Sequence, residues 1–163
     1  MLIGLFAINN INGIGNNGSM PWPANKDDLR WFKKNTMNNI VVMGRLTWDS
    51  SDMPSPLPNR LNVVFTNKHI DNDDILQYRG DVITPLMELS AIYPEKNIYI
   101  IGGSRILKQA QPVLEKLLIT RIDDNTECDT TLDLSDFLIG FKHANTIKTG
   151  ECKIEEWVRC KII

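Results

Sequence analysis

The sequence predicts an α/β fold, in which a central, mostly parallel and twisted sheet is flanked by helices and ends in a C-terminal antiparallel hairpin. Three observations predict this class. Short apolar runs recur along the chain, helix-like segments lie between them, and the last stretch has two strand-like arms without a helical pattern. Because 163 residues can form one domain with a substantial core, we expect residues 1–163 to be a single domain.

The predicted strands are rich in Ile, Val, Leu and aromatic residues. They cover residues 1–8, 39–44, 61–66, 81–85, 97–103, 116–122 and 154–163. The central runs alternate little with polar residues, which is typical of strands buried on both faces of a sheet. The last run is one arm of the expected hairpin, whose turn is predicted at Thr149, Gly150 and Glu151.

Four helices are predicted between these strands, over residues 26–36, 45–51, 85–92 and 104–111. Alternating strands and helices favour parallel pairing, because parallel strands need a long crossover that is usually a helix. The Pro-rich stretch 52–60 is predicted to be a surface loop. The sequence has no repeat or linker that would mark a second domain.

The composition is that of an ordinary globular protein, with 42% hydrophobic and 23% charged residues and a formal net charge of −2. Such a charge gives no basic footprint for nucleic acid or for an anionic membrane surface. The N-terminal run LIGLFAI is too short to cross a bilayer and lacks a positive flank. We therefore expect a buried strand there and a cytoplasmic protein.

Cysteines and histidines do not form a metal-binding pattern. Cys128, Cys152 and Cys160 are an odd number without metal-type spacing, so we expect free thiols in a reducing compartment. His69 and His143 lie in polar surroundings and are expected at the surface. We therefore predict no zinc site and no histidine-based catalytic triad.

A long Gly/Asn-rich loop, residues 9–25, follows the first predicted strand. Loops longer than about 12 residues without structure of their own are uncommon in compact domains and often act as lids. This loop carries Ile14, Met20 and Trp22, which a plain solvent-exposed loop has little reason to hold. We expect a lid over a ligand. The alternative is that these side chains only cover the core.

A second segment that folding alone explains poorly is the turn Gly102–Gly103, between a buried strand and a helix that starts near Ser104. Glycines let the backbone approach a ligand closely, and a helix start offers free N–H groups to a phosphate or pyrophosphate. This turn lacks the G-x-G-x-x-G spacing of the Rossmann fingerprint. The alternative is a turn that merely connects the strand to the helix.

Two adjacent aspartates open the first predicted helix. At about 100° per residue, Asp28 lies between Trp31 and Phe32 on the apolar side. Asp27 lies at the edge of that side, where the helix dipole and Arg30 explain it. A carboxylate among aromatic side chains has a raised pKa or a bound partner, which is typical of a catalytic or ligand-anchoring acid. The alternative is that Asp28 is a buried capping acid.

Six regions in the same order together resemble dihydrofolate reductase, over essentially the whole chain. They are GIGNNGSMPW (13–22), DLRWFKKNT (28–36), VVMGRLTW (41–48), LPNR (57–60), IYIIGGSRIL (98–107), and LLITRID (117–123) with CDT (128–130). The resemblance implies an NADPH-dependent oxidoreductase that reduces 7,8-dihydrofolate to tetrahydrofolate. Hydride would move to C6 while N5 takes a proton, and the product would supply one-carbon and thymidylate metabolism.

Two ways of counting place the family's acid differently. Counted from Trp22 the acid is Asp27, and counted back from Phe32 it is Asp28. The second count is preferred, because an acid and a phenylalanine on one helix must stay four residues apart, whereas the loop before them tolerates insertions. The segment PANKD then carries one extra residue, and both arguments agree on Asp28.

The resemblance also implies roles around the substrate. Asp28, Trp22 and Thr120 would form the catalytic set, in which Asp28 binds the pterin and promotes protonation of N5. Arg60 would pair bidentately with the glutamate α-carboxylate of the folate. The residues implied for substrate binding are Leu5, Phe6, Ala7, Leu29, Phe32, Met53, Leu57, Arg60 and Ile101.

NADPH rather than NADH is implied, because Arg45, Thr66, Asn67 and Lys68 match positions around the adenosine 2′-phosphate. The residues implied for cofactor binding are Ala7, Ile14, Gly15, Met20, Gly44, Arg45, Leu46, Thr47, Thr66, Asn67, Lys68, Ile101, Gly102, Gly103, Ser104, Arg105 and Ile106. The expected partners are dihydrofolate and antifolate-type small molecules, with no nucleic acid and no membrane, and the chain is expected to be a monomer.

Three positions depart from the family pattern. Leu107 stands where many members have a tyrosine near the nicotinamide, which implies slower hydride transfer. Leu46 replaces a residue that is often basic, which implies weaker pyrophosphate binding. Cys128 stands where some relatives have a glycine, so the grip of the Asp129 loop on the Met20 loop is expected to differ.

Two other functions stay open at this point. A pyrimidine reductase of riboflavin synthesis shares this fold and cofactor, although Trp22, Asp28, Phe32 and Arg60 together argue against it. A catalytically weak copy, kept as a binding or structural component, is the other alternative. An assay of NADPH consumption with dihydrofolate separates them.

Overall fold

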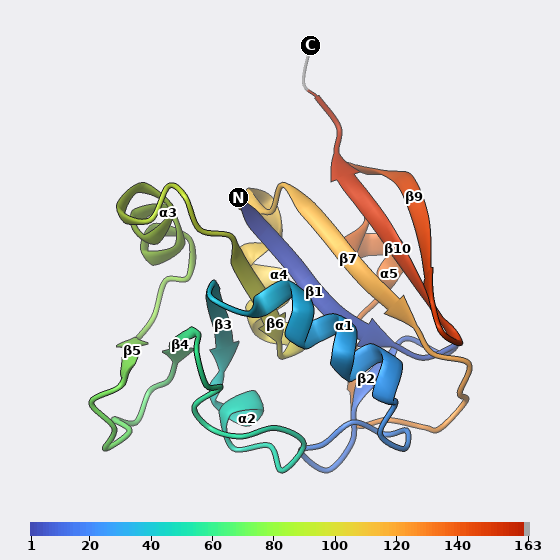
Figure 1. Cartoon of the computed structure of the whole chain (residues 1–163), viewed down its shortest axis with the longest axis horizontal. Coiled ribbons are helices and arrows are strands. Elements are labelled where there is room, and N and C mark those ends of the chain that lie inside the picture. The colour runs from blue at the N-terminus through green and yellow to red at the C-terminus, as the bar shows by residue number, and fades with distance from the viewer. Residues whose placement is uncertain (162–163) are drawn as a thin grey trace.

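A computed structural model of the chain describes residues 1–161 (Figure 1). The strands are β1 (Leu2–Ile8), β2 (Gly13–Gly15), β3 (Ile40–Gly44), β4 (Leu61–Phe65), β5 (Ile75–Tyr78), β6 (Ile98–Gly102), β7 (Lys116–Arg121), β8 (Thr130–Thr131), β9 (Phe141–Thr149) and β10 (Cys152–Arg159). The helices are α1 (Lys26–Thr36), α2 (Arg45–Trp48), α3 (Ile83–Ile92), α4 (Ser104–Ala110) and α5 (Leu134–Phe137), with a 3₁₀ turn at Gln111–Val113. The last two residues of the final predicted strand, 162–163, lie outside the described residues.

Eight of these strands form one sheet in the order β5-β4-β3-β6-β1-β7-β10-β9. Neighbours from β5 to β7 are all parallel, whereas β10 is antiparallel to both β7 and β9. The predicted mostly parallel sheet with a terminal antiparallel hairpin is confirmed. A small second sheet, which the sequence did not predict, pairs β2 with β8.

The predicted strand over residues 81–85 is wrong, because a helix begins there. The side chain of Asp81 accepts hydrogen bonds from the N–H groups of Ile83 and Thr84, both at 3.1 Å, and so satisfies the start of α3. Pro85 fits within the first helical turn, where its missing N–H has no partner to lose. The strand that pairs with β4 is instead β5, a short run that the sequence analysis missed.

Apolar residues lie on both faces of the sheet, because successive side chains of a strand point in opposite directions. On β1, Leu2, Phe6 and Ile8 pack in one cluster with residues of α3, α4 and α5. Ile3 and Leu5 pack in the other, which α1 covers on the side that faces the viewer in Figure 1. This burial on both faces explains why the strand sequences alternate so little.

The loops that follow the parallel strands gather at one edge of the sheet. Helix α2 starts directly after β3, and α4 starts two residues after β6. In open α/β sheets, ligands bind at the carboxyl ends of the strands, where such loops and helix starts meet. The fold therefore directs the search for a site to this edge.

The cysteines and histidines do not come together in a common site within residues 1–161. Cys128, Cys152 and Cys160 are free thiols, and His69 and His143 are exposed. Within residues 1–161, no cluster of three or more His, Cys, Asp or Glu side chains is arranged to hold a metal ion. Over the same range, none of the helices has the length and apolar character needed to cross a membrane.

Candidate active site

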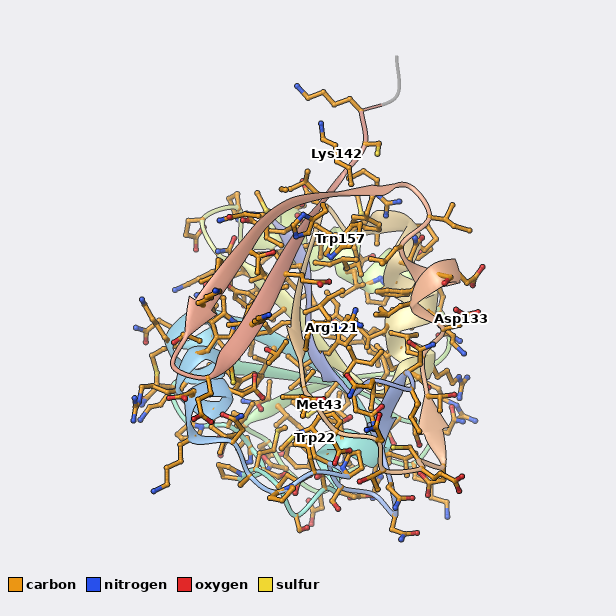
Figure 2. All side chains as sticks on the ribbon, turned by 90° about the vertical axis from the view of Figure 1, so that its right-hand side faces the viewer. Trp22, Met43, Arg121, Asp133, Lys142 and Trp157 are labelled. Carbon is orange, nitrogen blue, oxygen red and sulfur yellow. The ribbon has the colours of Figure 1, made fainter. Side chains whose placement is uncertain are left out.

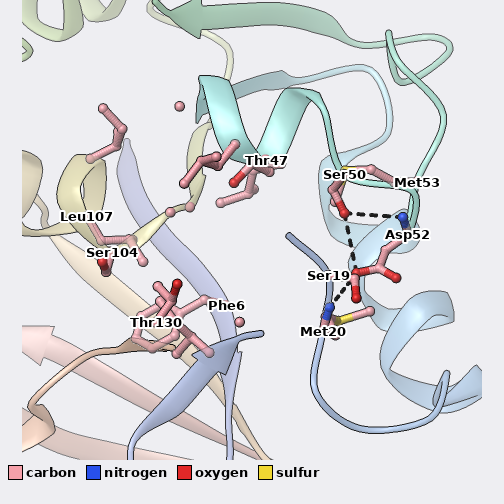
Figure 3. A pocket seen from close by; sticks show the side chains of 18 of the residues that line it. Phe6, Ser19, Met20, Thr47, Ser50, Asp52, Met53, Ser104, Leu107 and Thr130 are labelled. Carbon is pink, nitrogen blue, oxygen red and sulfur yellow. Dashed lines mark hydrogen bonds between the residues drawn. The ribbon is translucent and has the colours of Figure 1, made fainter. Parts of the chain in front are cut away.

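A cavity of about 830 Å³ lies at the carboxyl ends of the parallel strands. Its walls come from β1, α1, α2, the start of α4, the long loop after β1, and the loop before β4. Figure 3 shows part of this cavity, with Thr47 of α2 and Ser104 of α4 on one side and Met20 and Met53 on another. Its size suits an elongated ligand or two ligands in contact.

Asp28 lies in the wall of this cavity, where α1 faces β7. Its Oδ1 accepts a hydrogen bond of 2.8 Å from the hydroxyl of Thr120, which is 1% exposed. Burial raises the pKa of the Asp28 carboxyl above its ordinary value of 3.8, and the bond from Thr120 offsets part of the rise. Such a carboxyl can bind a hydrogen-bond donor of a ligand and can exchange a proton near neutral pH more easily than an exposed aspartate.

The two aspartates at the start of α1 have different surroundings. The helix is capped by Asn25, whose Oδ1 accepts the N–H groups of Asp27 and Asp28 at 3.0 and 3.1 Å. Asp28 is therefore not the capping acid, and that alternative is wrong. Asp27 does not line the cavity and lies 3.9 Å from the guanidinium of Arg30, so it is a surface acid in the first helical turn.

Trp22 lines the cavity and is 6% exposed. Its indole N–H is buried and has no hydrogen-bond partner within residues 1–161. Buried N–H groups are nearly always paired, so this donor is one that a ligand can satisfy.

Arg60 lies at the far end of α1 from Asp28. Its Nη1 donates to the hydroxyl of Thr36, the last residue of the helix, at 3.0 Å, and its Nε donates to the carbonyl of Pro58 at 2.9 Å. Burial lowers the pKa of the guanidinium, which still stays charged at neutral pH. Because two of its donors are already bound, the side chain is held in one orientation and the remaining donors are available to an anion.

The segment that carries Arg60 is shaped by Asn62, a buried polar residue that the sequence analysis missed. The Asn62 side chain accepts the N–H of Leu57 and donates to its carbonyl, both at 2.9 Å, and it also donates to the carbonyl of Arg60. Three such bonds fix the turn 57–60 against the cavity. Asn62 is the one polar residue in the apolar run LNVVF, and this was the signal that could have pointed to its role.

A second cation, Arg45, is held between α2 and the loop after β4. Its Nε lies 3.0 Å from Oδ2 of Asp49, and its Nη1 donates to the Thr66 hydroxyl and the Lys68 carbonyl at 3.3 and 3.2 Å. The guanidinium therefore lies next to Thr66, whose hydroxyl also bonds within this loop. An arginine that is held in one orientation and keeps further N–H donors free is suited to a phosphate.

The Gly102–Gly103 turn brings backbone close to the cavity. Gly102 has a φ of +139°, a conformation that residues with a side chain rarely adopt, and the peptide bond between the two glycines is cis. At Gly44 a Cβ would lie 3.0 Å from a side-chain carbon of Ile106, so α4 packs closely on the end of β3. Gly102, Gly103 and Ser104 line the same cavity as Arg45, and the first N–H groups of a helix have no partner within the helix.

The long loop after β1 closes another side of the cavity. The N–H of Asn17 donates to Oδ2 of Asp129 at 2.9 Å, so the loop is held by the Asp129 segment although Cys128 departs from the family pattern. Gly13, Gly15 and Gly18 have the spacing G-x-G-x-x-G, but they belong to β2 and a turn rather than to a helix start. The loop is thus a cover over the cavity and not a dinucleotide turn.

Asp52 ties this loop to the opposite side of the cavity. Its Oδ2 accepts the N–H of Met20 and lies 3.3 Å from the hydroxyl of Ser50, which in turn accepts the N–H of Asp52 at 3.2 Å. Figure 3 shows these bonds, of which the one between Met20 and Asp52 joins the two loops. The sequence analysis treated this stretch as a plain surface loop and missed Asp52, because an acid at the start of a Pro-rich stretch gives little signal.

The cavity brings together nearly all residues that the sequence pointed to. Those that line it are Leu5, Phe6, Ala7, Ile14, Gly15, Met20, Trp22, Asp28, Leu29, Phe32, Gly44, Arg45, Leu46, Thr47, Met53, Leu57, Arg60, Thr66, Asn67, Ile101, Gly102, Gly103, Ser104, Arg105, Ile106 and Thr120. Lys68 does not line it and contributes its backbone carbonyl to Arg45 instead. Leu46 is 73% exposed, and Leu107 is fully buried at the border of the cavity and the core.

Comparisons with known proteins point to one family. The family model for dihydrofolate reductase matches residues 1–153. A dihydrofolate reductase of Buchnera aphidicola from Schizaphis graminum is 42% identical over 124 residues, which are 76% of this chain and 73% of that protein. The type 9 dihydrofolate reductase of Escherichia coli is 36% identical over 138 residues, 82% of this chain and 76% of that protein.

A solved structure gives the same answer at the level of the fold. The dihydrofolate reductase of Enterococcus faecalis, in complex with NADP(H) and the inhibitor RAB-propyl, superposes with a TM-score of 0.82. It is 27% identical and is aligned over 99% of this chain and 97% of its own. This chain therefore belongs to the dihydrofolate reductase family.

Proposed function

We propose that this chain reduces 7,8-dihydrofolate to 5,6,7,8-tetrahydrofolate, with NADPH as the hydride donor. The observation that carries the proposal is the placement of Asp28 and Arg60. The carboxyl of Asp28 is held by Thr120 near the first turn of α1, and Arg60 is held by Thr36 at the last turn. The helix α1 thus carries the acid at its start and holds, at its end, a cation from the segment before β4, and both line the same cavity.

The spacing of these two groups suits dihydrofolate. Asp28 and Thr36 are eight residues apart, which corresponds to about 12 Å along a helix. A pterin ring bound to Asp28 and a glutamate carboxylate bound to Arg60 require an extended ligand of that order. Phe32 lies on α1 between them and lines the cavity, where it can pack against the aromatic middle of the substrate.

The cofactor would lie on the other side of the cavity. We assign its 2′-phosphate to Arg45, Thr66 and Asn67, with the backbone carbonyl of Lys68 holding Arg45 in place. Its pyrophosphate would meet the turn at Gly102 and Gly103 and the free N–H groups that follow. When bound, NADPH supplies the hydride.

The residues of the chain bind the substrate, promote its protonation and exclude water. Asp28 binds the amino group and ring nitrogen of the pterin and promotes protonation at N5, helped by its raised pKa. Thr120 fixes the carboxyl of Asp28, and Trp22 closes the site beside it with a free indole N–H. The loop that carries Met20 covers the site and excludes water, which hydride transfer requires.

We also propose that the chain acts as a monomer in the cytoplasm. The cavity is complete within one chain, and the three thiols are unpaired, as in a reducing compartment.

Antifolate-type molecules that carry a protonated diaminopyrimidine would pair with Asp28.

Loss of NADPH absorbance, followed with and without dihydrofolate, tests the proposed activity. We expect turnover that needs both ligands and a clear preference for NADPH over NADH, because Arg45 recognises the 2′-phosphate. Parallel reactions with a pyrimidine substrate of riboflavin synthesis should show none. Folded protein that binds NADPH but does not consume it with dihydrofolate would refute the proposal and favour a catalytically weak copy.

A further inference from the structure

The turn of the C-terminal hairpin lies against the start of α1. The N–H of Glu151 donates to Oδ2 of Asp27 at 3.2 Å, and the thiol of Cys152 donates to Oδ1 of Asn25, also at 3.2 Å. Figure 2 shows the tip of the hairpin, in salmon, beside the blue ribbon of α1. Residues that are more than 120 positions apart in the sequence are thus joined at the end of the helix that carries Asp28.

The fit of this contact is close. Gly150 has a φ of +60°, and a Cβ built on it would lie 2.1 Å from Oδ2 of Asp27 and 2.4 Å from the carboxyl carbon. A Cβ atom essentially never lies within 3.0 Å of another heavy atom outside its own neighbourhood. Any side chain at Gly150 must therefore displace the Asp27 carboxylate or the turn. Only glycine allows the turn and the carboxylate of Asp27 to meet in this way.

Asn25 links the hairpin to the first turn of α1, which carries Asp28. The same Oδ1 that accepts the Cys152 thiol also accepts the backbone N–H groups of Asp27 and Asp28. The hairpin therefore holds both the cap and the first turn of α1, directly beside the bond from Thr120 to Asp28.

We propose that the β9–β10 turn positions the catalytic acid, with Asp27 and Gly150 as the positioning residues and Asp28 as the group that they place. This inference rests on the proposed function of Asp28. It gives Asp27 a role in the reaction that its place outside the cavity does not suggest. Asp27 acts through the helix start and touches neither substrate nor cofactor.

The first test is the Gly150→Ala variant, with Gly140→Ala as its matched control. Both glycines have positive φ, at +60° and +89°, in turns that border β9. At Gly140 a Cβ would meet only Nη1 of Arg159, at 3.0 Å, and no atom of α1. We expect Gly150→Ala to lower kcat about five- to tenfold through misplacement of the acid. NADPH affinity should not change, and Gly140→Ala should lose stability without this fall in kcat.

The second test is a double-mutant cycle with Asp27→Ala. Once the Asp27 carboxylate is gone, Gly150→Ala has nothing to displace, so it should change kcat by less than about twofold in that background. Asp27→Asn keeps an acceptor oxygen for the Glu151 N–H and should stay within about twofold of the wild type. Additive effects of Gly150→Ala and Asp27→Ala would overturn the proposal, as would equal falls in kcat for the two glycine variants.

A third measurement does not depend on turnover. The carboxyl carbon of Asp28 can be titrated by NMR in the folded apoprotein, where the titratable neighbours are Asp27 on the same helix and Cys152 on β10. Gly150→Ala should move the titration midpoint of Asp28, and Gly140→Ala should not. A midpoint unchanged in both variants would refute the positioning role. Absence of wild-type turnover would instead refute the proposed function, whatever the titration shows.

Discussion

The two sides of the cavity are built in different ways. On one side, Asp28, Thr120 and Phe6 belong to α1, β7 and β1, and their backbone bonds are part of a helix or the central sheet. On the other side, the loops around Met20 and Asp52 are more exposed and meet through single hydrogen bonds. Such bonds exchange with water at little cost, whereas those of the sheet open only with the fold. The first side, which we call the fixed side, holds the proposed catalytic acid, and we expect the second side, the loop side, to control access.

Breaking the fixed side should have the largest effect. We expect Asp28→Asn to lower turnover at neutral pH by at least about a hundredfold, because a positioned acid typically contributes that much. Activity should recover in part at low pH, where the substrate arrives protonated. Stopped-flow hydride transfer as a function of pH measures this, with Asp27→Asn as the control. A large loss for Asp27→Asn with little for Asp28→Asn would mean that the assignment of the acid is wrong.

The same substitution should make the apoprotein more stable. Because burial raises the pKa of Asp28, the folded state binds its proton at higher pH than the unfolded state does. The carboxyl therefore costs stability as pH rises from about 3.8 through the raised pKa, and the cost is complete above it. Thermal unfolding should show a higher Tm for Asp28→Asn at pH 7, and the two curves should converge as pH falls toward 3.8. Equal Tm values at both pH values would contradict this account.

A substitution of Arg60 tests the fixed side at the C-terminal end of α1, where Thr36 holds the guanidinium. Removal of one member of a hydrogen-bonded charge pair typically costs about 2–5 kcal/mol, so Arg60→Leu should raise the KM for dihydrofolate at least tenfold. The Kd for NADPH should stay close to that of the wild type, since Arg60 lies at the end of α1 and away from Arg45. Fluorescence titrations with each ligand separate the two. Equal weakening of both ligands would count against the assigned role of Arg60.

On the loop side of the cavity, around Met20 and Asp52, Asp52→Ala should have a smaller effect. It removes the acceptor of the Met20 N–H and leaves the loop held by Asp129. We expect NADPH to dissociate about fivefold faster, which corresponds to about 1 kcal/mol. Ser50→Ala should shift the rate in the same direction, whereas Ser51→Ala is the control, because Ser51 is exposed and does not line the cavity. No difference between the two serine variants would argue against the contact.

The smallest change in rate is expected for Leu107→Tyr. Leu107 is fully buried, with 0% of its surface exposed to solvent. It packs in the core beneath the proposed cofactor side of the cavity. A tyrosine must overpack this site, at a cost of about 1–3 kcal/mol, so we expect a lower Tm and a hydride-transfer rate within about twofold of the wild type. A marked gain in rate would show that the missing ring limits the reaction.

The sequence predicted the elements that form the fixed side and missed much of the other. The apolar runs and the position of Asp28 on its helix follow from local periodicity, which is strong where a segment is buried. The contacts of Asp52 with Met20 and of Thr36 with Arg60 join segments that meet only in the folded chain, so no local pattern shows them. The false strand at 81–85 arose because the apolar run hid a cap at Asp81, and α3 took its place.

The bond between Thr120 and Asp28 joins residues 92 positions apart, and β1 pairs with β6 and β7 from the second half of the chain. During synthesis the first strand therefore waits for most of the polypeptide before either of its neighbours leaves the ribosome. Such non-local pairing is slow to form and leaves apolar edges open in the meantime. The order of translation thus makes Asp28, the proposed catalytic acid, one of the first groups to be made and among the last to find its partner.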